Sequence, residues 1–120
     1  MGESTMGEST MGDYYQSDDV AKFGEIGRCA PDLATRFFTW YRAVFADGAL
    51  SEREKALIAL AVAHVKQCPY CIDAYTKTCL EKGADREQMT EAVHAAAALS
   101  AGSCLIHGLQ MHRRAEQLEM

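Results

Sequence analysis

The chain has 120 residues, of which 48% are hydrophobic and 24% charged, and its formal net charge is −5. The apolar content excludes a disordered chain, and the length suits one domain with a buried core. The acidic balance, with no basic cluster beyond Arg113 and Arg114, argues against a nucleic-acid partner.

The first residues form a repeat, with MGEST at 1–5 and again at 6–10. We expect residues 1–12 to be a tag or a disordered tail, and residues 13–120 to form a single domain. The repeat lacks the basic start and the apolar stretch of a signal peptide. No apolar run approaches the ~18 residues of a membrane span, so we expect a cytoplasmic protein without membrane contacts. In a reducing cytoplasm, closely spaced cysteines are more often catalytic or metal-binding than structural disulfides.

The composition favours helices, because nineteen alanines stand against five valines and four isoleucines and strict apolar–polar alternation is absent. The prediction is therefore an all-α fold. Residues 14–28, which include Tyr14 and Tyr15, are expected to form a short helix or an irregular arm. An amphipathic helix is expected after Pro31, with these apolar side chains at helical spacing: Leu33, Phe37, Trp40, Tyr41 and Val44.

A second helix is expected from a capping box at Ser51 and Glu54 to about Gln67. It is apolar on nearly every side, which predicts a central, buried helix. The next helix begins at Pro69 and is expected to end at Gly83.

Asp85 is expected to cap the helix that follows, with Met89, Val93, Ala96 and Ala97 on its buried side. Gly102 and Gly108 predict two helices, or one kinked helix, between there and about residue 117.

The most informative segment is Cys68-Pro69-Tyr70-Cys71. A helix that begins at Pro69 places Cys68 at its N-terminus, where unpaired N–H groups and the helix dipole stabilise a thiolate. Two cysteines on one turn can form a disulfide or share a metal ion. A thioredoxin fold is excluded, because that motif needs a βαβ setting and helices are predicted on both sides here.

Two further side chains are candidates for the same chemistry. His64 lies four residues before Cys68 and, on a continuous helix, would share its face and take the thiol proton. Tyr75 lies four residues after Cys71, where its phenol would donate a hydrogen bond to a thiolate or a peroxide oxygen. The structural alternative for both is an ordinary core residue.

A zinc site is the competing reading, because Cys104 and His107 would complete a Cys₃His set with Cys68 and Cys71. Cys29 and Cys79 are expected to be small buried apolar residues. No metal and no cofactor are expected in the preferred reading.

The segment REKALIALAVAHVKQCPYCIDAYTK, residues 53–77, resembles the core of the alkylhydroperoxidase D-like, or carboxymuconolactone decarboxylase-like, superfamily. The resemblance covers roughly residues 31–110. The segments YYQSDDVAKFGEIG (14–27) and VFADGALSEREKALIALAVAH (44–64) resemble a narrower group, the peroxidase-like proteins associated with arsenosugar biosynthesis.

The resemblance implies an all-helical subunit that assembles into trimers or hexamers, with its active site near subunit contacts. It also implies a CxxC pair that cycles between dithiol and disulfide. Two positions depart from the family's peroxidase pattern: Ala56 stands where the pattern has a glutamate, and Tyr75 where it has a histidine. Glu54 cannot take over the first role, because two residues turn it about 200° round the helix.

The leading hypothesis is a thiol-dependent, peroxidase-like oxidoreductase that uses Cys68 and Cys71, a peroxide or disulfide substrate and an external thiol reductant. The departures at Ala56 and Tyr75 leave its peroxidase activity open. One alternative is a non-catalytic binding protein whose vicinal thiols hold zinc or a thiophilic ligand such as trivalent arsenic. Another is a subunit that serves assembly alone, with both cysteines buried and inert.

Overall fold

The computed structural model of the chain describes residues 16–120, which are helical and contain no β-strand. The all-α prediction is therefore confirmed. The expectations for the repeat at 1–12 and for Tyr14 and Tyr15 fall outside the described residues. In chain order, the elements are the 3₁₀ helices η1 (Ser17–Asp19) and η2 (Phe23–Arg28) and the α-helices α2 (Pro31–Phe45), α3 (Glu52–Val65), α4 (Pro69–Glu81) and α5 (Arg86–Glu119).

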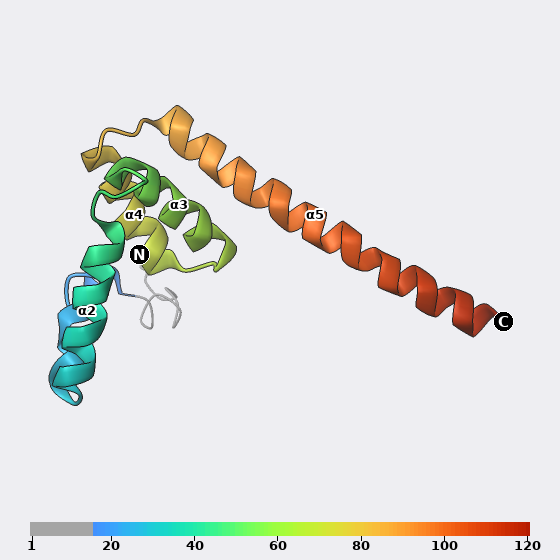
Figure 1. Cartoon of the computed structure of the whole chain (residues 1–120), viewed down its shortest axis with the longest axis horizontal. Helices are drawn as coiled ribbons and strands as arrows, with labels where there is room; N and C mark the ends of the chain where they lie inside the picture. Colours follow the sequence, from blue (N-terminus) through green and yellow to red (C-terminus); the bar gives the residue numbers. More distant parts are fainter. Residues whose placement is uncertain (1–15) are drawn as a thin grey trace, which may run out of the picture.

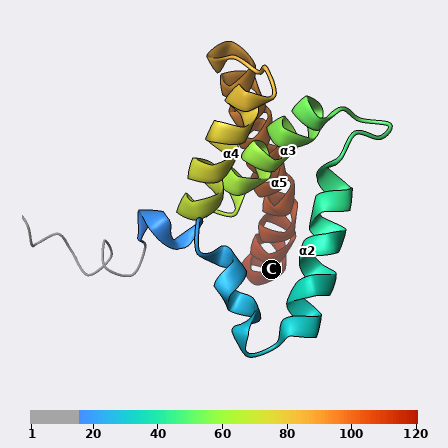
Figure 2. The same ribbon diagram turned by 90° about the vertical axis from the view of Figure 1, so that its left-hand side faces the viewer.

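Helix α3 is the centre of the molecule, because it packs against both α4 and the start of α5 (Figure 1). Helix α2 packs chiefly against η2, with a smaller contact to α3, so that η2 and α2 lie side by side on one flank of the body (Figure 2). Most of α5 extends away from this body. The radius of gyration is 19.7 Å, whereas a compact domain of about 100 residues has one of roughly 13 Å.

The helix starts that the sequence predicts for α2, α3, α4 and α5 are observed. Ser51 Oγ accepts from the Glu54 N–H at 3.1 Å, and Glu54 Oε1 accepts from the Ser51 N–H at 2.8 Å. Asp85 forms the equivalent box with Gln88 at the start of α5. Each box satisfies two backbone donors that have no partner within the helix, which fixes where α3 and α5 begin.

The buried core is small and lies where α3, α4 and α5 meet. Its residues in the described part of the chain are Ala56, Leu60, Ala63, Cys79, Ala84 and Met89. The expectation that α3 is buried on nearly every side is wrong, because Ile58, Val62 and Val65 on its other faces are exposed. Packing by α4 and α5 covers one side of α3 and leaves the remainder of its apolar surface open.

Helix α2 also turns a different face inward than its apolar pattern suggests. Leu33 and Trp40 are 70% and 63% exposed, whereas Phe38, Tyr41 and Phe45 are half-buried. Tyr41 and Phe45 lie toward α4, where the Phe45 ring centroid is 5.4 Å from that of Tyr75. An apolar stripe more than 100° wide does not by itself specify which of its edges is covered.

Helix α5 is one continuous helix from Arg86 to Glu119, so of the two forms expected around Gly102 and Gly108, the pair of separate helices is wrong. Each glycine costs a helix only about 1 kcal/mol, and the surrounding alanines and leucines are good helix formers. Within residues 16–120, nothing lies within 4 Å of the point where a Cβ at either glycine would stand, so neither position requires glycine for a close approach.

Helix α5 also corrects the expectation that no segment could span a membrane. An 18-residue window of it has a mean hydropathy of 1.4, so its length and composition are sufficient for a span, and none of that window is buried within the chain. Small residues and histidines interrupt its apolar runs, and for this reason a search for unbroken runs misses it. Core helices of water-soluble proteins meet the same criteria, so this finding alone assigns no membrane role.

Candidate active site

The site lies in the turn between α3 and α4. Gln67 adopts a left-handed conformation with φ of 54°, which ends the path of α3. The Cys68 N–H then donates to the Ala63 carbonyl at 3.1 Å, and Cys68 becomes the N-cap of α4. Pro69 follows at the first helical position, where its missing N–H costs nothing. The predicted position of Cys68 at a helix N-terminus is therefore observed.

The two sulfurs of the motif lie together on the first turn of α4. Cys68 Sγ and Cys71 Sγ are 2.8 Å apart, within hydrogen-bond distance, and both cysteines are unbridged and half-buried. The backbone N–H of Cys71 also donates to Cys68 Sγ, at 3.3 Å. Cys68 thus receives the cap hydrogen bond that a serine or aspartate makes at other helix starts.

This asymmetry separates the acidities of the two thiols. The hydrogen bond with the Cys71 thiol lowers the pKa of Cys68, with further help from the backbone N–H groups of Cys71 and Tyr70. Burial raises the pKa of Cys71 to about 11, and the hydrogen bond and charge of Cys68 add to the rise. When the pair holds a single proton, these shifts favour that proton on Cys71 and the negative charge on Cys68.

Tyr75 stands one turn beyond Cys71, as its spacing predicts, and its hydroxyl hydrogen-bonds the hydroxyl of Tyr41 on α2. Burial raises the pKa of Tyr75, and the Tyr41 hydroxyl and the charge of the neighbouring Cys71 raise it further. The Tyr75 phenol is therefore protonated at any physiological pH. It can donate a hydrogen bond and cannot act as a base.

Cys71, Tyr41 and Tyr75 lie between two hollows. One is a cavity of about 410 Å³ that reaches both sulfurs. Its other walls come from η1, the start of η2 and α4, and are Asp19, Val20, Phe23, Tyr70 and Ala74. The second, of about 440 Å³, lies between α2 and α3 and has Lys55 and Lys66 among its lining residues.

Two lining residues of the 410 Å³ cavity make a contact that sequence reasoning missed. The Tyr70 hydroxyl donates to Asp19 Oδ2 at 2.8 Å, which joins η1 to α4. This contact spans fifty-one positions of sequence, and no local pattern indicates it.

His64 is not brought to the cysteines. Its Nδ1 lies 2.8 Å from the Leu60 carbonyl oxygen, and its ring lines hollows that face α5, beside Val93 and Ile72. The predicted i,i+4 alignment with Cys68 requires a continuous helix, and the left-handed Gln67 interrupts it.

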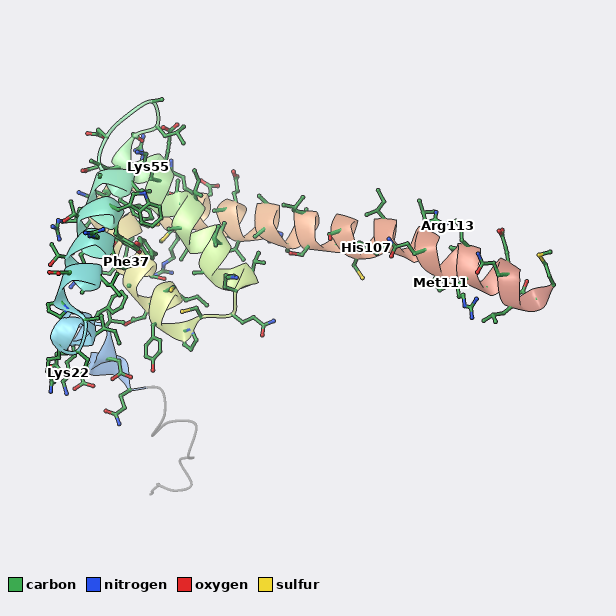
Figure 3. The ribbon with its side chains drawn as sticks, turned by 60° about the horizontal axis from the view of Figure 1, so that its bottom comes forward. Lys22, Phe37, Lys55, His107, Met111 and Arg113 are labelled. Atoms are coloured by element: carbon green, nitrogen blue, oxygen red, sulfur yellow. The ribbon has the colours of Figure 1, made fainter. Side chains whose placement is uncertain are left out.

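The zinc set is not assembled either. In residues 16–120, no group of three or more His, Cys, Asp or Glu side chains lies close enough to hold a metal ion. Cys104 is exposed on α5, and His107 lies on its outer half, well beyond the body of α2–α4 (Figure 3). The vicinal pair stands without third and fourth ligands from α5.

The structure also shows where the other residues singled out from the sequence lie. Ala56 is buried against α4 and α5 in the core, and Glu54 is occupied by its capping box, so neither acts at the sulfurs. Cys79 is fully buried, as expected. Cys29 is exposed, and its expected burial is wrong, because it follows η2 at the outer edge of the molecule.

A protein-family model and two proteins of similar sequence match this chain. A family model described as "Carboxymuconolactone decarboxylase family" matches residues 31–112. An uncharacterised protein of the cox locus of Paracoccus denitrificans is 45% identical over 87 residues, which are 72% of this chain and 78% of that protein. An uncharacterised protein of Cupriavidus necator is 36% identical over 70 residues, 58% of this chain and 62% of that one.

Two crystal structures share the fold. A protein from Methanobacterium thermoautotrophicum matches with a TM-score of 0.67 and 31% identity, over 74% of this chain and 97% of that one. A carboxymuconolactone decarboxylase family protein from Legionella pneumophila matches with a TM-score of 0.65 and 31% identity, over 82% and 88% of the two chains. These matches confirm the wider resemblance, and the narrower one to the arsenosugar-associated group stays a prediction.

Proposed function

The chain belongs to the carboxymuconolactone decarboxylase family, and from this premise we propose that it is a thiol-dependent oxidoreductase of the peroxidase-like type. Its working groups are Cys68 and Cys71, with Tyr75 as a hydrogen-bond donor. The observation that supports this function best is the position of two sulfurs 2.8 Å apart at the N-terminus of α4, where Cys68 also accepts the Cys71 N–H. A low-pKa thiolate beside a protonated thiol holds the attacking group and the resolving group of a dithiol reaction.

With a hydroperoxide as the oxidant, the Cys68 thiolate attacks the distal oxygen. A sulfur–oxygen bond forms, the oxygen–oxygen bond breaks, and the electron pair leaves with the alkoxide. The alkoxide takes the Cys71 proton and departs as an alcohol. The Cys71 thiolate then attacks the sulfenic sulfur, a disulfide forms, and the hydroxide that leaves is protonated by solvent to water.

With a disulfide as the oxidant, the same thiolate attacks one of its sulfurs, the sulfur–sulfur bond breaks, and the other sulfur leaves as a thiolate that takes the Cys71 proton. The Cys71 thiolate then attacks the Cys68 sulfur of the mixed disulfide, and the second thiolate that leaves is protonated by solvent. In both cases an external dithiol reduces the Cys68–Cys71 disulfide and is itself oxidised. His64 has no part in this scheme, because it faces α5.

The residues that line the 410 Å³ cavity indicate which kind of substrate it would accept. They are aromatic or aliphatic apart from Asp19 and the two cysteines, and a cavity of about 410 Å³ admits a molecule larger than hydrogen peroxide. We therefore expect a small organic oxidant to react faster than hydrogen peroxide.

We also propose that the protein is a homo-oligomer of the cytoplasm, where a reducing environment resets the pair. The exposed apolar surface of α5 supports the oligomer, because monomeric water-soluble proteins rarely leave so long an apolar helix uncovered. Trimers and hexamers remain the predicted assemblies.

Steady-state turnover tests this function. Wild-type protein, an external dithiol and either an organic hydroperoxide or a small disulfide should give turnover that Cys68→Ser and Cys71→Ser each abolish. Cys104→Ser, which removes an exposed thiol outside the site, is the matched control and should be unaffected. Full activity in both single variants of the pair would refute the proposal.

A further inference from the structure

Two tyrosine hydroxyls from different helices meet beside the cysteine pair. Tyr41 comes from α2 and Tyr75 from α4, thirty-four positions apart, and their hydroxyls hydrogen-bond each other. Both rings line the 410 Å³ cavity that also reaches Cys68 and Cys71. The sequence indicates Tyr75 as a candidate site residue, whereas it indicates no role at the site for Tyr41.

We propose that Tyr41 is a positioning residue for the reaction at the cysteine pair: its hydroxyl orients that of Tyr75, so that the Tyr75 O–H points into the cavity toward the oxygen that leaves the peroxide. This inference rests on the proposed function. It says how the site stabilises a leaving group that departs through oxygen, as distinct from one that departs through sulfur.

The number of hydroxyl protons in the tyrosine pair limits the hydrogen bonds that it can donate. A phenol has one hydrogen to donate and can accept with its oxygen. When the Tyr41 O–H donates to Tyr75, the Tyr75 hydrogen is left for another acceptor, and the bond that Tyr75 accepts makes it a stronger donor. An alkoxide released beside Cys71 is an acceptor of this kind.

The surroundings hold both rings in place. The Tyr41 ring centroid is 5.4 Å from that of Phe37 and 4.9 Å from that of Phe45, and the Phe45 centroid is 5.4 Å from that of Tyr75. A row of packed rings on α2 therefore leads to the α4 tyrosine. Burial raises the pKa of Tyr75, which keeps its hydroxyl protonated and able to donate.

The test measures kcat/KM for Tyr41→Phe, Tyr75→Phe and the double variant with two oxidants, an organic hydroperoxide and a small disulfide. Phenylalanine keeps the ring contacts and removes only the hydroxyl. We expect a loss of about 100-fold for Tyr75→Phe and about 10-fold for Tyr41→Phe with the hydroperoxide. The double variant should be no slower than Tyr75→Phe alone, because Tyr41 acts through Tyr75.

The disulfide distinguishes a role in the reaction from a merely structural role. Damage to the fold would slow the reactions with both oxidants, whereas a lost hydrogen bond to the leaving oxygen would slow only the reaction with the hydroperoxide. Sulfur is a weak hydrogen-bond acceptor, so both tyrosine variants should reduce the disulfide at nearly the wild-type rate. Thr78→Val is the matched control, because it removes a half-buried α4 hydroxyl that bonds the Ala74 carbonyl within the helix. It should react normally with both oxidants.

Three results would overturn the inference while leaving the proposed function intact. They are a wild-type hydroperoxide rate in Tyr41→Phe, additive losses in the double variant, and equal losses with both oxidants, which would indicate damage to the fold. A wild-type protein that reduces neither oxidant would overturn both this inference and the proposed function.

Discussion

Cys68 and Cys71 are three residues apart, yet their thiols differ in acidity because one caps α4 and the other lies within its first turn. The cap position gives Cys68 a backbone donor at 3.3 Å and a thiol neighbour at 2.8 Å, and both stabilise negative charge. Cys71 is more buried and faces the charge of its neighbour, and both effects favour its protonated form. Under the proposed function, this difference makes Cys68 the attacking thiol.

The pH dependence of alkylation tests this difference. In a variant without the exposed thiols of Cys29 and Cys104, Cys68 should react with iodoacetamide as a thiolate. Its rate should rise with pH and level off above a pKa lower than that of an ordinary thiol.

Two Cys71 variants test whether the Cys71 side chain is what lowers the pKa of Cys68. Cys71→Ser keeps a side-chain donor, whereas Cys71→Ala removes it, so the Cys68 pKa should be higher in the alanine variant. Identical alkylation profiles in the two variants would show that the Cys71 side chain does not lower the pKa of Cys68.

For single residues, the sequence predicts the N-cap position of Cys68 correctly, but it does not predict where the side chains around the cysteine pair lie. Pro69 marks the first turn of α4, and this alone places Cys68 at the cap. The alignment of His64 with Cys68 fails because one left-handed residue, Gln67, breaks the helix between them. Tyr41 joins Tyr75 from a different helix, and no spacing within either helix contains that information.

At the scale of elements, α3 brings α4 and α5 together through small side chains. Ala56 and Ala63 let the neighbouring helices approach closely, and Leu60 fills the space between them. The helix boundaries follow from capping residues that can be read locally, such as Ser51 and Asp85. The choice of buried face on α2 does not, because it depends on where η2 and α4 lie.

A matched pair of leucines tests this packing. Leu60→Ala, at a side chain 2% exposed, should lower the free energy of unfolding by about 2–5 kcal/mol. Leu33→Ala, at a side chain 70% exposed, should change it by less than about 1 kcal/mol. Chemical denaturation followed by circular dichroism measures both, and equal losses in the two variants would contradict the core described here.

At the scale of the whole molecule, α5 is the feature that a single chain does not explain. Its first turns complete the core through Met89, but Leu99 and Leu105, on its later turns, are each 77% exposed. The glycines of this helix predict a break or a kink, and the exposed apolar side chains of its outer half support the proposal that a partner covers them. We expect that partner to be a second copy of the chain.

Sedimentation velocity tests this expectation. The wild type should sediment as an oligomer, and Leu105→Glu should shift it toward the monomer, because a carboxylate in an apolar contact is strongly unfavourable. Gln110→Glu adds the same charge at an exposed polar position of α5 and should have little effect. A monomeric wild type would contradict the expectation, and wild-type monomers that float with lipid vesicles would point to a membrane as the partner of α5.

The most direct test of the central claim is a single turnover followed by mass spectrometry. Reduced protein is mixed with one equivalent of an organic hydroperoxide, quenched with an alkylating agent and digested. We expect a Cys68–Cys71 disulfide to form as the hydroperoxide is consumed, while Cys29 and Cys104 are alkylated. Consumption of the hydroperoxide with Cys68 and Cys71 both still alkylated, or a disulfide that pairs either of them with another cysteine, would contradict this expectation.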